Sequence, residues 1–225
     1  MRQSFLLLLV LASLLPLQAQ FGVSTVYTVP QTSFADGSVE DFLDDGLEFS
    51  VNYWFRLKEK RVEFLPSLSY AKYDYSEDVT MGEVRNVPAS FREIGFQFHT
   101  RVYPFDFGTD CDCPTFGKQA PALEKGFFIQ ISPGVSWLED VNSTGLADQE
   151  TEQQSSSISP TIGAAIGLDF GLSNLITLSP IAGIRYSIGD APNAIEHNPA
   201  AATNDTFSKF FAGLHLGIRL DEKRY

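Results

Sequence analysis

The sequence contains little of what most enzyme and metal sites require. Its 225 residues include two cysteines and three histidines, too few for the usual clustered zinc sites. The motifs GxxxxGK[ST], GxGxxG, HExxH and GxSxG are absent, so the common signatures of phosphate loops, dinucleotide sites, zinc proteases and serine hydrolases find no support. Lysine and arginine total 16 against 28 aspartates and glutamates, a formal net charge of -12. We expect no nucleic-acid partner, because phosphate binding needs a basic surface.

Long hydrophobic runs are also scarce, and the longest one stands at the amino terminus. Arg2, an apolar run over 5–15 and the small residue Ala19 have the layout of a secretory signal peptide. The run is about half the ~20 residues that a spanning helix needs. We therefore expect residues 1–19 to be a signal peptide and residues 20–225 to form one domain that can enter a membrane only as strands.

The mature sequence does contain a regular alternation of apolar and polar residues, which is the period of a β-strand with one apolar face. Eight segments show it: 21–29, 47–57, 62–73, 92–104, 126–137, 157–170, 175–187 and 207–220. The last segment alternates as regularly as the inner ones, which favours a closed sheet without an edge. The predicted fold is all-β, an eight-stranded antiparallel up-and-down transmembrane β-barrel.

The links between these segments are of two kinds. Residues 58–61 and 171–174 are tight turns, whereas the links 30–46, 74–91, 138–156 and 188–206 are long. In an up-and-down order the long links lie at one end, as the external loops of outer-membrane barrels do. The link 105–124 is the exception, because it is long although its position predicts a periplasmic turn.

Alternation alone leaves two barrels open: a soluble calycin-like ligand carrier with the apolar face inside, and a transmembrane barrel with that face outside. The polar face carries small residues where a water-facing surface would carry lysine and glutamate, among them Gly95, Gly134, Gly163, Gly167, Gly183, Gly213 and Gly217. The apolar face carries aromatic residues towards both ends, namely Phe55, Phe64, Phe127, Phe170, Tyr70, Trp137, Tyr186 and Phe210. Two aromatic girdles favour the transmembrane orientation.

These features together resemble the small outer-membrane β-barrels of Gram-negative bacteria, the group with OmpA-type, OmpX-type and OmpW-type members; the glycine-rich segments 158–170 and 211–220 contribute to the likeness. The segment 103–118 is more similar to Bacteroidota members. Tyr225 departs from the pattern, since it has the opposite parity from Leu220. The resemblance implies a monomeric, non-enzymatic protein of the bacterial outer membrane, with a structural or surface-binding role, in contact with outer-membrane lipid and lipopolysaccharide. The external partner is unknown.

With this orientation the inward face collects four acids and five bases. They are Glu48, Glu63, Glu93 and Asp169 against Arg56, Arg101, Arg185, Lys209 and Arg219, with His99 and His215 on the same face. Isolated charges in a narrow interior are costly, whereas paired ones are tolerated. We predict a paired lumen charge network that fills the interior, with Arg101 facing Glu93 or an acid of a neighbouring strand. A proton or ion relay, or a gate, through the interior is the alternative.

The expected external links are strongly acidic. They carry 17 of the 28 acids with a single base, Arg85: Asp36, Glu40, Asp41, Asp44, Asp45, Asp74, Glu77, Asp78, Glu83, Glu139, Asp140, Asp148, Glu150, Glu152, Asp190, Glu196 and Asp205. Mutual repulsion and solubility are the simple interpretation. Weak capture of calcium or magnesium that bridges the links to glycolipid phosphates is the alternative. No dedicated cofactor is expected.

Two further features leave alternatives open. Cys111 and Cys113 favour a disulfide in an oxidising compartment, although a bridge across one residue is strained; a shared metal with Asp110 and Asp112, an intermolecular bridge and free thiols are the others. A lipid-A-modifying enzyme would need a serine and a histidine within hydrogen-bond reach. His197, beside Glu196, is the surface candidate.

Overall fold

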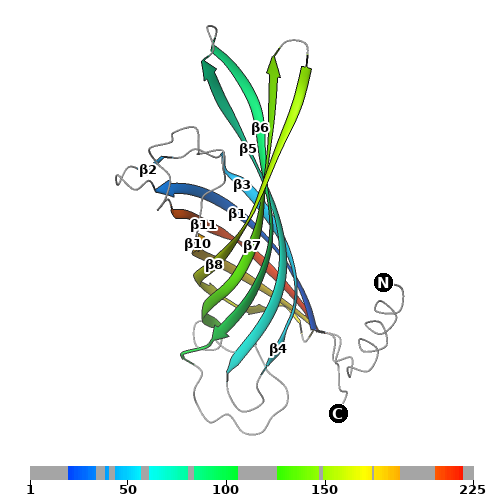
Figure 1. The fold of residues 1–225 in the computed structure, drawn as a ribbon. Helices are drawn as coiled ribbons and strands as arrows, with labels where there is room; N and C mark the ends of the chain where they lie inside the picture. Colours follow the sequence, from blue (N-terminus) through cyan, green and yellow to red (C-terminus); the bar gives the residue numbers. More distant parts are fainter. Residues whose placement is uncertain are drawn as a thin grey trace, which may run out of the picture.

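A computed structural model describes residues 20–33, 39–40, 44–56, 61–80, 84–105, 126–146, 149–173, 175–187 and 206–219, which form one β-sheet (Figure 1). Its strands are β1 Gln20–Ser33, β2 Val39–Glu40, β3 Gly46–Tyr53, β4 Phe55–Arg56, β5 Val62–Thr80, β6 Val84–Val102, β7 Phe127–Leu146, β8 Gln149–Leu168, β9 Phe170–Gly171, β10 Ile176–Ser187 and β11 Thr206–Arg219. Among these residues, no helix has the length and hydrophobicity that a membrane span requires.

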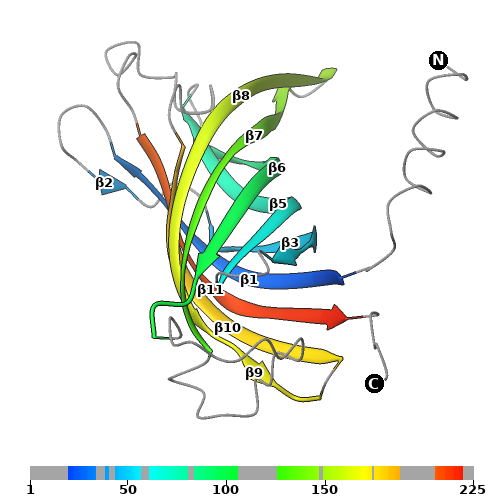
Figure 2. The same ribbon diagram turned by 90° about the horizontal axis from the view of Figure 1, so that it is seen from below.

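The sheet closes on itself. β1 pairs with β3 on one side and with β11 on the other, and β11 pairs in turn with β10 (Figures 1 and 2). β4 continues β3 beyond Trp54, β9 continues β8 beyond Asp169, and β2 is a two-residue strand beside β1. The wall therefore consists of eight antiparallel strands in the order β1, β3–β4, β5, β6, β7, β8–β9, β10, β11. The predicted fold class is confirmed.

The strands exceed their predicted lengths at the loop end. β5 and β6 stay paired up to Thr80 opposite Val84, and β7 and β8 up to Leu146 opposite Gln149. The prediction of long loops at 74–91 and 138–156 was therefore wrong. Figure 1 shows these two hairpins rising beyond the barrel and diverging. The alternation of apolar and polar residues is weaker in these segments, while the backbone pairing of the strands continues.

The two faces of the wall differ in polarity. The outward side chains of β3 are apolar and exposed, as the 57% exposure of Val51 and the 54% exposure of Phe49 illustrate. The inward side chains include charged residues that are almost fully buried, such as Glu48 and Arg185. A calycin-like carrier needs the opposite arrangement, so that alternative was wrong.

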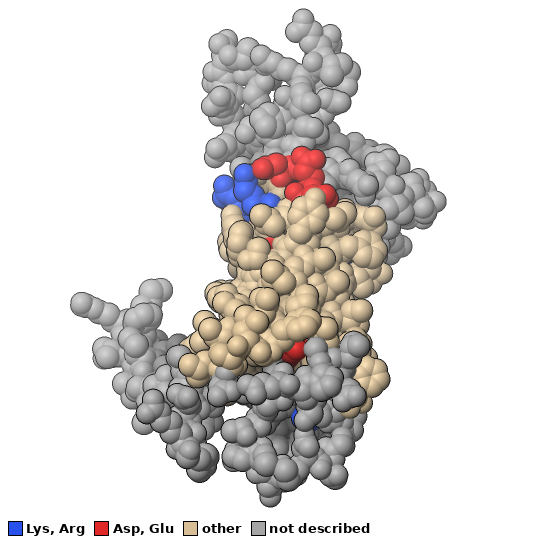
Figure 3. Space-filling view, turned by 180° about the vertical axis from the view of Figure 1, so that it is seen from behind, with Lys and Arg blue, Asp and Glu red and all other residues tan. Residues whose placement is uncertain are grey.

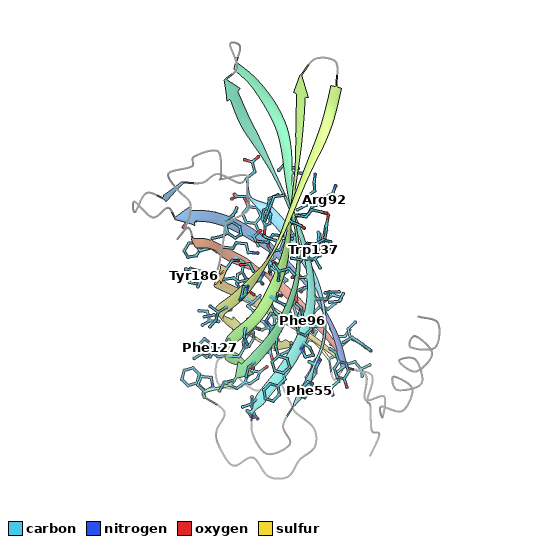
Figure 4. The ribbon with its side chains drawn as sticks, in the orientation of Figure 1. Phe55, Arg92, Phe96, Phe127, Trp137 and Tyr186 are labelled. Carbon is cyan, nitrogen blue, oxygen red and sulfur yellow. The ribbon has the colours of Figure 1, made fainter. Side chains whose placement is uncertain are left out.

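The outward face has the layered composition of a membrane-facing surface. In Figure 4, Phe55 and Phe127 lie near the short-turn end, Trp137 and Tyr186 lie near the loop end, and Phe96 lies between them. On the face seen in Figure 3, a band largely without charged side chains lies below the acidic and basic groups of the loop end. Aromatic rows at both ends of an apolar band are the pattern of a transmembrane barrel.

Glycine on the inward face allows neighbouring strands to pack closely. A Cβ atom on Gly213 would lie 2.2 Å from the carbonyl oxygen of Thr25 and 2.5 Å from the Cα of Val26. A Cβ atom on Gly217, in the same strand, would meet nothing nearer than 3.5 Å. The packing of the neighbouring strand therefore requires glycine at position 213 but not at position 217.

Candidate functional site

The loop-side half of the barrel interior holds a chain of buried charges from four strands. Arg185 of β10 donates two hydrogen bonds to Glu48 of β3, from Nη1 to Oε2 at 2.7 Å and from Nη2 to Oε1 at 3.0 Å. Lys209 of β11 donates to Glu93 of β6 and lies 3.9 Å from Glu48 Oε2. Ser136 donates to Glu93 Oε1 at 2.7 Å. Charges of alternating sign therefore cross the interior.

An apolar cluster adjoins these charges inside the barrel. Its members are Ala71, Tyr73, Phe91, Leu138 and Phe207. The ring centroids of Tyr73 and Phe91 are 6.0 Å apart, and those of Phe91 and Phe207 are 6.1 Å apart. Lys209 Nζ lies 5.9 Å from the Tyr73 ring and 5.8 Å from the Phe207 ring, within cation–π range. The ammonium group is thus surrounded by carboxylates and aromatic faces.

The short-turn half contains a second polar group, centred on Arg101. Its Nε donates to Gln130 Oε1 at 2.8 Å, and its guanidinium carbon lies 4.4 Å from the centroid of the Phe128 ring. Gln130 donates to Ser132 at 3.1 Å, and Ser132 Oγ lies 2.8 Å from His99 Nδ1. Of the two partners predicted for Arg101, Glu93 was wrong, since Glu93 contacts Lys209 and Ser136. Glu63, an acid of the neighbouring strand β5, is directly opposite Arg101 in the β5–β6 pair.

In the same half of the barrel, the hydroxyl group of one tyrosine contacts two carboxyl groups. The hydroxyl of Tyr103 lies 2.8 Å from Glu63 Oε2 and 2.8 Å from Asp169 Oδ2. Ser179 donates to the other oxygen of Asp169. A cavity with room for about one water molecule adjoins this cluster and is lined in part by Glu63, Asp169, Ser179 and Trp54. A buried water is the ligand that a cavity of this size accommodates.

The outward rim of the loop end carries charges next to the aromatic row. Lys72 Nζ lies 2.8 Å from Asp74 Oδ1, and Arg92 Nη1 lies 3.7 Å from Glu139 Oε2. The hydroxyl of Tyr27 donates to Asp45 on the same rim. Lys72 is directly opposite Arg92 in the β5–β6 pair.

Comparison with solved structures identifies the kind of barrel. Ail, the attachment invasion locus protein of Yersinia pestis, in complex with the heparin analogue sucrose octasulfate, superposes with a TM-score of 0.50 at 12% identity, over 90% of this chain and 100% of that chain. The chain has the fold of a small outer-membrane barrel. Neisserial surface protein A gives a TM-score of 0.46 at 14% identity over 89% of this chain and 97% of its own. OprG of Pseudomonas aeruginosa gives 0.43 at 13% identity, over 90% and 96%.

Sequence comparison adds no family. No family model matches the chain, and no curated protein matches it. The likeness to solved outer-membrane barrels therefore concerns the fold alone, and the similarity to the Bacteroidota members stays a prediction.

The structure divides the predicted charge network of this outer-membrane-type barrel into separate groups. Glu48, Glu93, Arg185 and Lys209 come together in the loop-side half, and Glu63, Arg101 and Asp169 lie buried in the other half. The side chains of Arg56 and Arg219, together with Cys111, Cys113 and His197, lie outside the described part of the chain. The buried aromatic residues were not predicted, although Tyr73, Phe91, Phe128 and Phe207 occupy polar-parity positions that could have shown them.

A serine–histidine contact does occur, but it lies inside the barrel. Ser132 is buried, and the third member of its chain is the Gln130 amide, which contacts both Ser132 Oγ and His99 Nδ1. A hydrolase triad needs an orienting acid and access to its substrate. His215 contacts Asn52 at 3.3 Å. Within the described residues no group of three or more His, Cys, Asp or Glu side chains could hold a metal ion.

Proposed function

We propose that this protein is a non-enzymatic barrel of the bacterial outer membrane that carries surface-exposed hairpins and loops on a closed, rigid wall. The observation that carries the proposal is the inverted burial of the barrel, with apolar side chains exposed outside and charged ones buried inside. Only a hydrocarbon surrounding makes this distribution favourable, because in water the exposed apolar belt would aggregate. Export by the segment 1–19 and a monomeric state belong to the same proposal.

The interior contacts support a lumen without an aqueous path. A porin-like channel lines its lumen with solvated charges, whereas the side chains of Glu48, Glu93, Arg185 and Lys209 are at most 5% exposed. The apolar clusters around Phe91 and Phe128 fill space between the charged groups. Eight strands leave an interior just wide enough for side chains. The role of the protein is therefore structural or surface-binding rather than conductive.

The external end favours a cationic or metal-bridged partner. Of the 28 acids, 17 lie in the segments between the predicted strands at this end, with Arg85 as the single base. The Ail structure contains a sulfated sugar analogue, and such a polyanion would be repelled by acidic loops. We propose that divalent cations link these carboxylates to outer-membrane glycolipid phosphates or to an anionic partner.

The two tryptophans test the orientation. Trp54 is 7% exposed and faces inward, whereas Trp137 is 45% exposed on the outward face near the loop end. In vesicles of lipids brominated high on the acyl chain, W54F, which retains Trp137, should lose most of its fluorescence, and W137F should lose little. A parallel gel should show heat-modifiable migration of the folded protein. Stronger quenching of W137F than of W54F would contradict the membrane orientation.

A further inference from the structure

Two cations of the outward face stand side by side. Lys72 and Arg92 are directly opposite each other in the β5–β6 pair, and the side chain of each is 47% exposed. Like charges at directly opposite positions destabilise a β-sheet. Among the lysines and arginines whose side chains the structure describes, these are the two exposed ones. In a chain with net charge -12, such a pair indicates an anion that both residues face.

The level of the pair along the barrel is that of lipid headgroups. One row closer to the barrel centre, Tyr70 is opposite Ile94, and Ile94 is opposite Trp137. Figure 4 shows Arg92 above Trp137, with Phe96 further below. Successive outward residues of a strand are about 7 Å apart, so Lys72 and Arg92 lie about that far beyond the aromatic row. Aromatic girdles mark the boundary between acyl chains and headgroups.

The neighbouring carboxylates leave this pair able to bind another anion. Lys72 contacts Asp74, whose side chain is 68% exposed, at 2.8 Å, and Arg92 approaches Glu139 at 3.7 Å, beyond hydrogen-bond distance. Solvent-exposed ion pairs contribute little free energy. A phosphate group offers Arg92 a bidentate acceptor and Lys72 a denser charge than a carboxylate does.

We infer that Lys72 and Arg92 bind the phosphate of an outer-leaflet lipid, whose acyl chains lie on the apolar surface of Tyr70, Ile94 and Trp137. The inference rests on the proposed membrane orientation and deepens it. A lipid fits better than a soluble anion because the apolar surface continues directly from the two cations on the same strands. Exposed Asp44, Asp45 and Asp74 on the water side oppose the approach of a soluble polyanion.

Binding of lipid A to the folded mature protein in detergent, measured by native mass spectrometry, tests this inference. Each of K72Q and R92Q should lower the affinity about fivefold, the factor that corresponds to about 1 kcal/mol per cation at an anionic surface. D74N should raise it, because Lys72 loses its competing carboxylate. R61Q, at the short-turn end of the wall, is the matched control and should leave the affinity unchanged. Lipid A stripped of its phosphates should bind to the wild type no better than phosphorylated lipid A binds to the double variant K72Q/R92Q.

Two results would overturn the inference. The first is that the variant K72Q/R92Q still shows heat-modifiable migration and binds lipid A as tightly as the wild type. The barrel would then be folded, but the two cations would not form a phosphate site. The second is binding of inorganic phosphate as tight as that of lipid A, which would assign the pair to a soluble anion. Failure of the wild type to insert into vesicles at all is a different outcome, since it would refute the proposed membrane location itself.

Discussion

Replacing Glu48 by glutamine removes the negative partner of the buried guanidinium of Arg185. The variant E48Q keeps the volume of the side chain but leaves Arg185 facing an uncharged amide in place of two charged oxygens at 2.7 and 3.0 Å. Both side chains of the pair are 5% exposed, so water cannot replace the lost charge. Breaking one partner of such a pair costs about 3 to 5 kcal/mol.

The surroundings of the pair predict an asymmetry between its two members. When Arg185 is replaced by methionine, Glu48 still has Lys209 at 3.9 Å, whereas E48Q leaves Arg185 with the Phe211 ring at 5.5 Å. Unit charges about 4 Å apart interact by about 4 kcal/mol at an effective dielectric constant of about 20. E48Q should therefore cost more than R185M, and both should cost more than D44N at an exposed position, which should change stability by less than about 0.5 kcal/mol.

A double-mutant cycle measures the coupling directly. Urea unfolding in lipid vesicles, followed by tryptophan fluorescence, gives the free energy of unfolding of E48Q, R185M, E48Q/R185M and D44N. The double variant should lose less than the sum of the single losses, by up to about 3 kcal/mol, because it no longer holds an uncompensated buried charge. Equal small losses for E48Q and D44N would refute the reasoning, since they would mean that water reaches the pair.

Three further outcomes are expected, two from the geometry of the barrel and one from the predicted topology. Protein reconstituted in planar bilayers should show no steady ion conductance, and stable channels of porin size would contradict the filled interior. G213A should destabilise the barrel by about 1 to 3 kcal/mol through overpacking, because its Cβ would meet the backbone of β1, whereas G217A should be close to neutral; unfolding of both variants by urea compares them. Cys111, predicted to be periplasmic, should resist a membrane-impermeant thiol reagent on intact cells after mild reduction, and labelling from outside would invert the predicted topology.

The period of the sequence predicted the wall of the barrel because the wall obeys one physical rule throughout. Most outward positions of the wall are apolar and most inward positions are polar, so a period of two extends through all eight strands. The exposed fractions of Phe49 and Val51 and the burial of Glu48 follow this parity. The orientation was predictable too, since the polar face carries glycine where a water-facing surface would carry lysine and glutamate, and the apolar face carries aromatic residues towards both ends.

Two features of the structure were not predicted from the sequence, because they depart from this alternation in different ways. Between Tyr73 and Phe91 the sequence is rich in polar and charged residues and resembles a loop, although its backbone is paired. The buried rings of Phe91 and Phe207 are apolar on the inward face, where parity predicts polar groups. The interior is filled by aromatic rings as well as by ion pairs, so an inward position can be apolar or charged. The polarity of the sequence alone therefore does not show which aromatic residues point inward.

Which interior charges pair with each other depends on the closure of the barrel. Glu93 and Arg101 lie on the same strand, eight positions apart, which at about 3.3 Å per residue places their backbones about 26 Å from each other. Glu93 instead meets Lys209 of β11, which lies four places further in the order of strands around the wall and so faces β6 across the interior. Such a contact is decided by the diameter, tilt and stagger of the barrel. Parity shows that a charge points inward, but the strand number and the register decide which opposite charge it meets there.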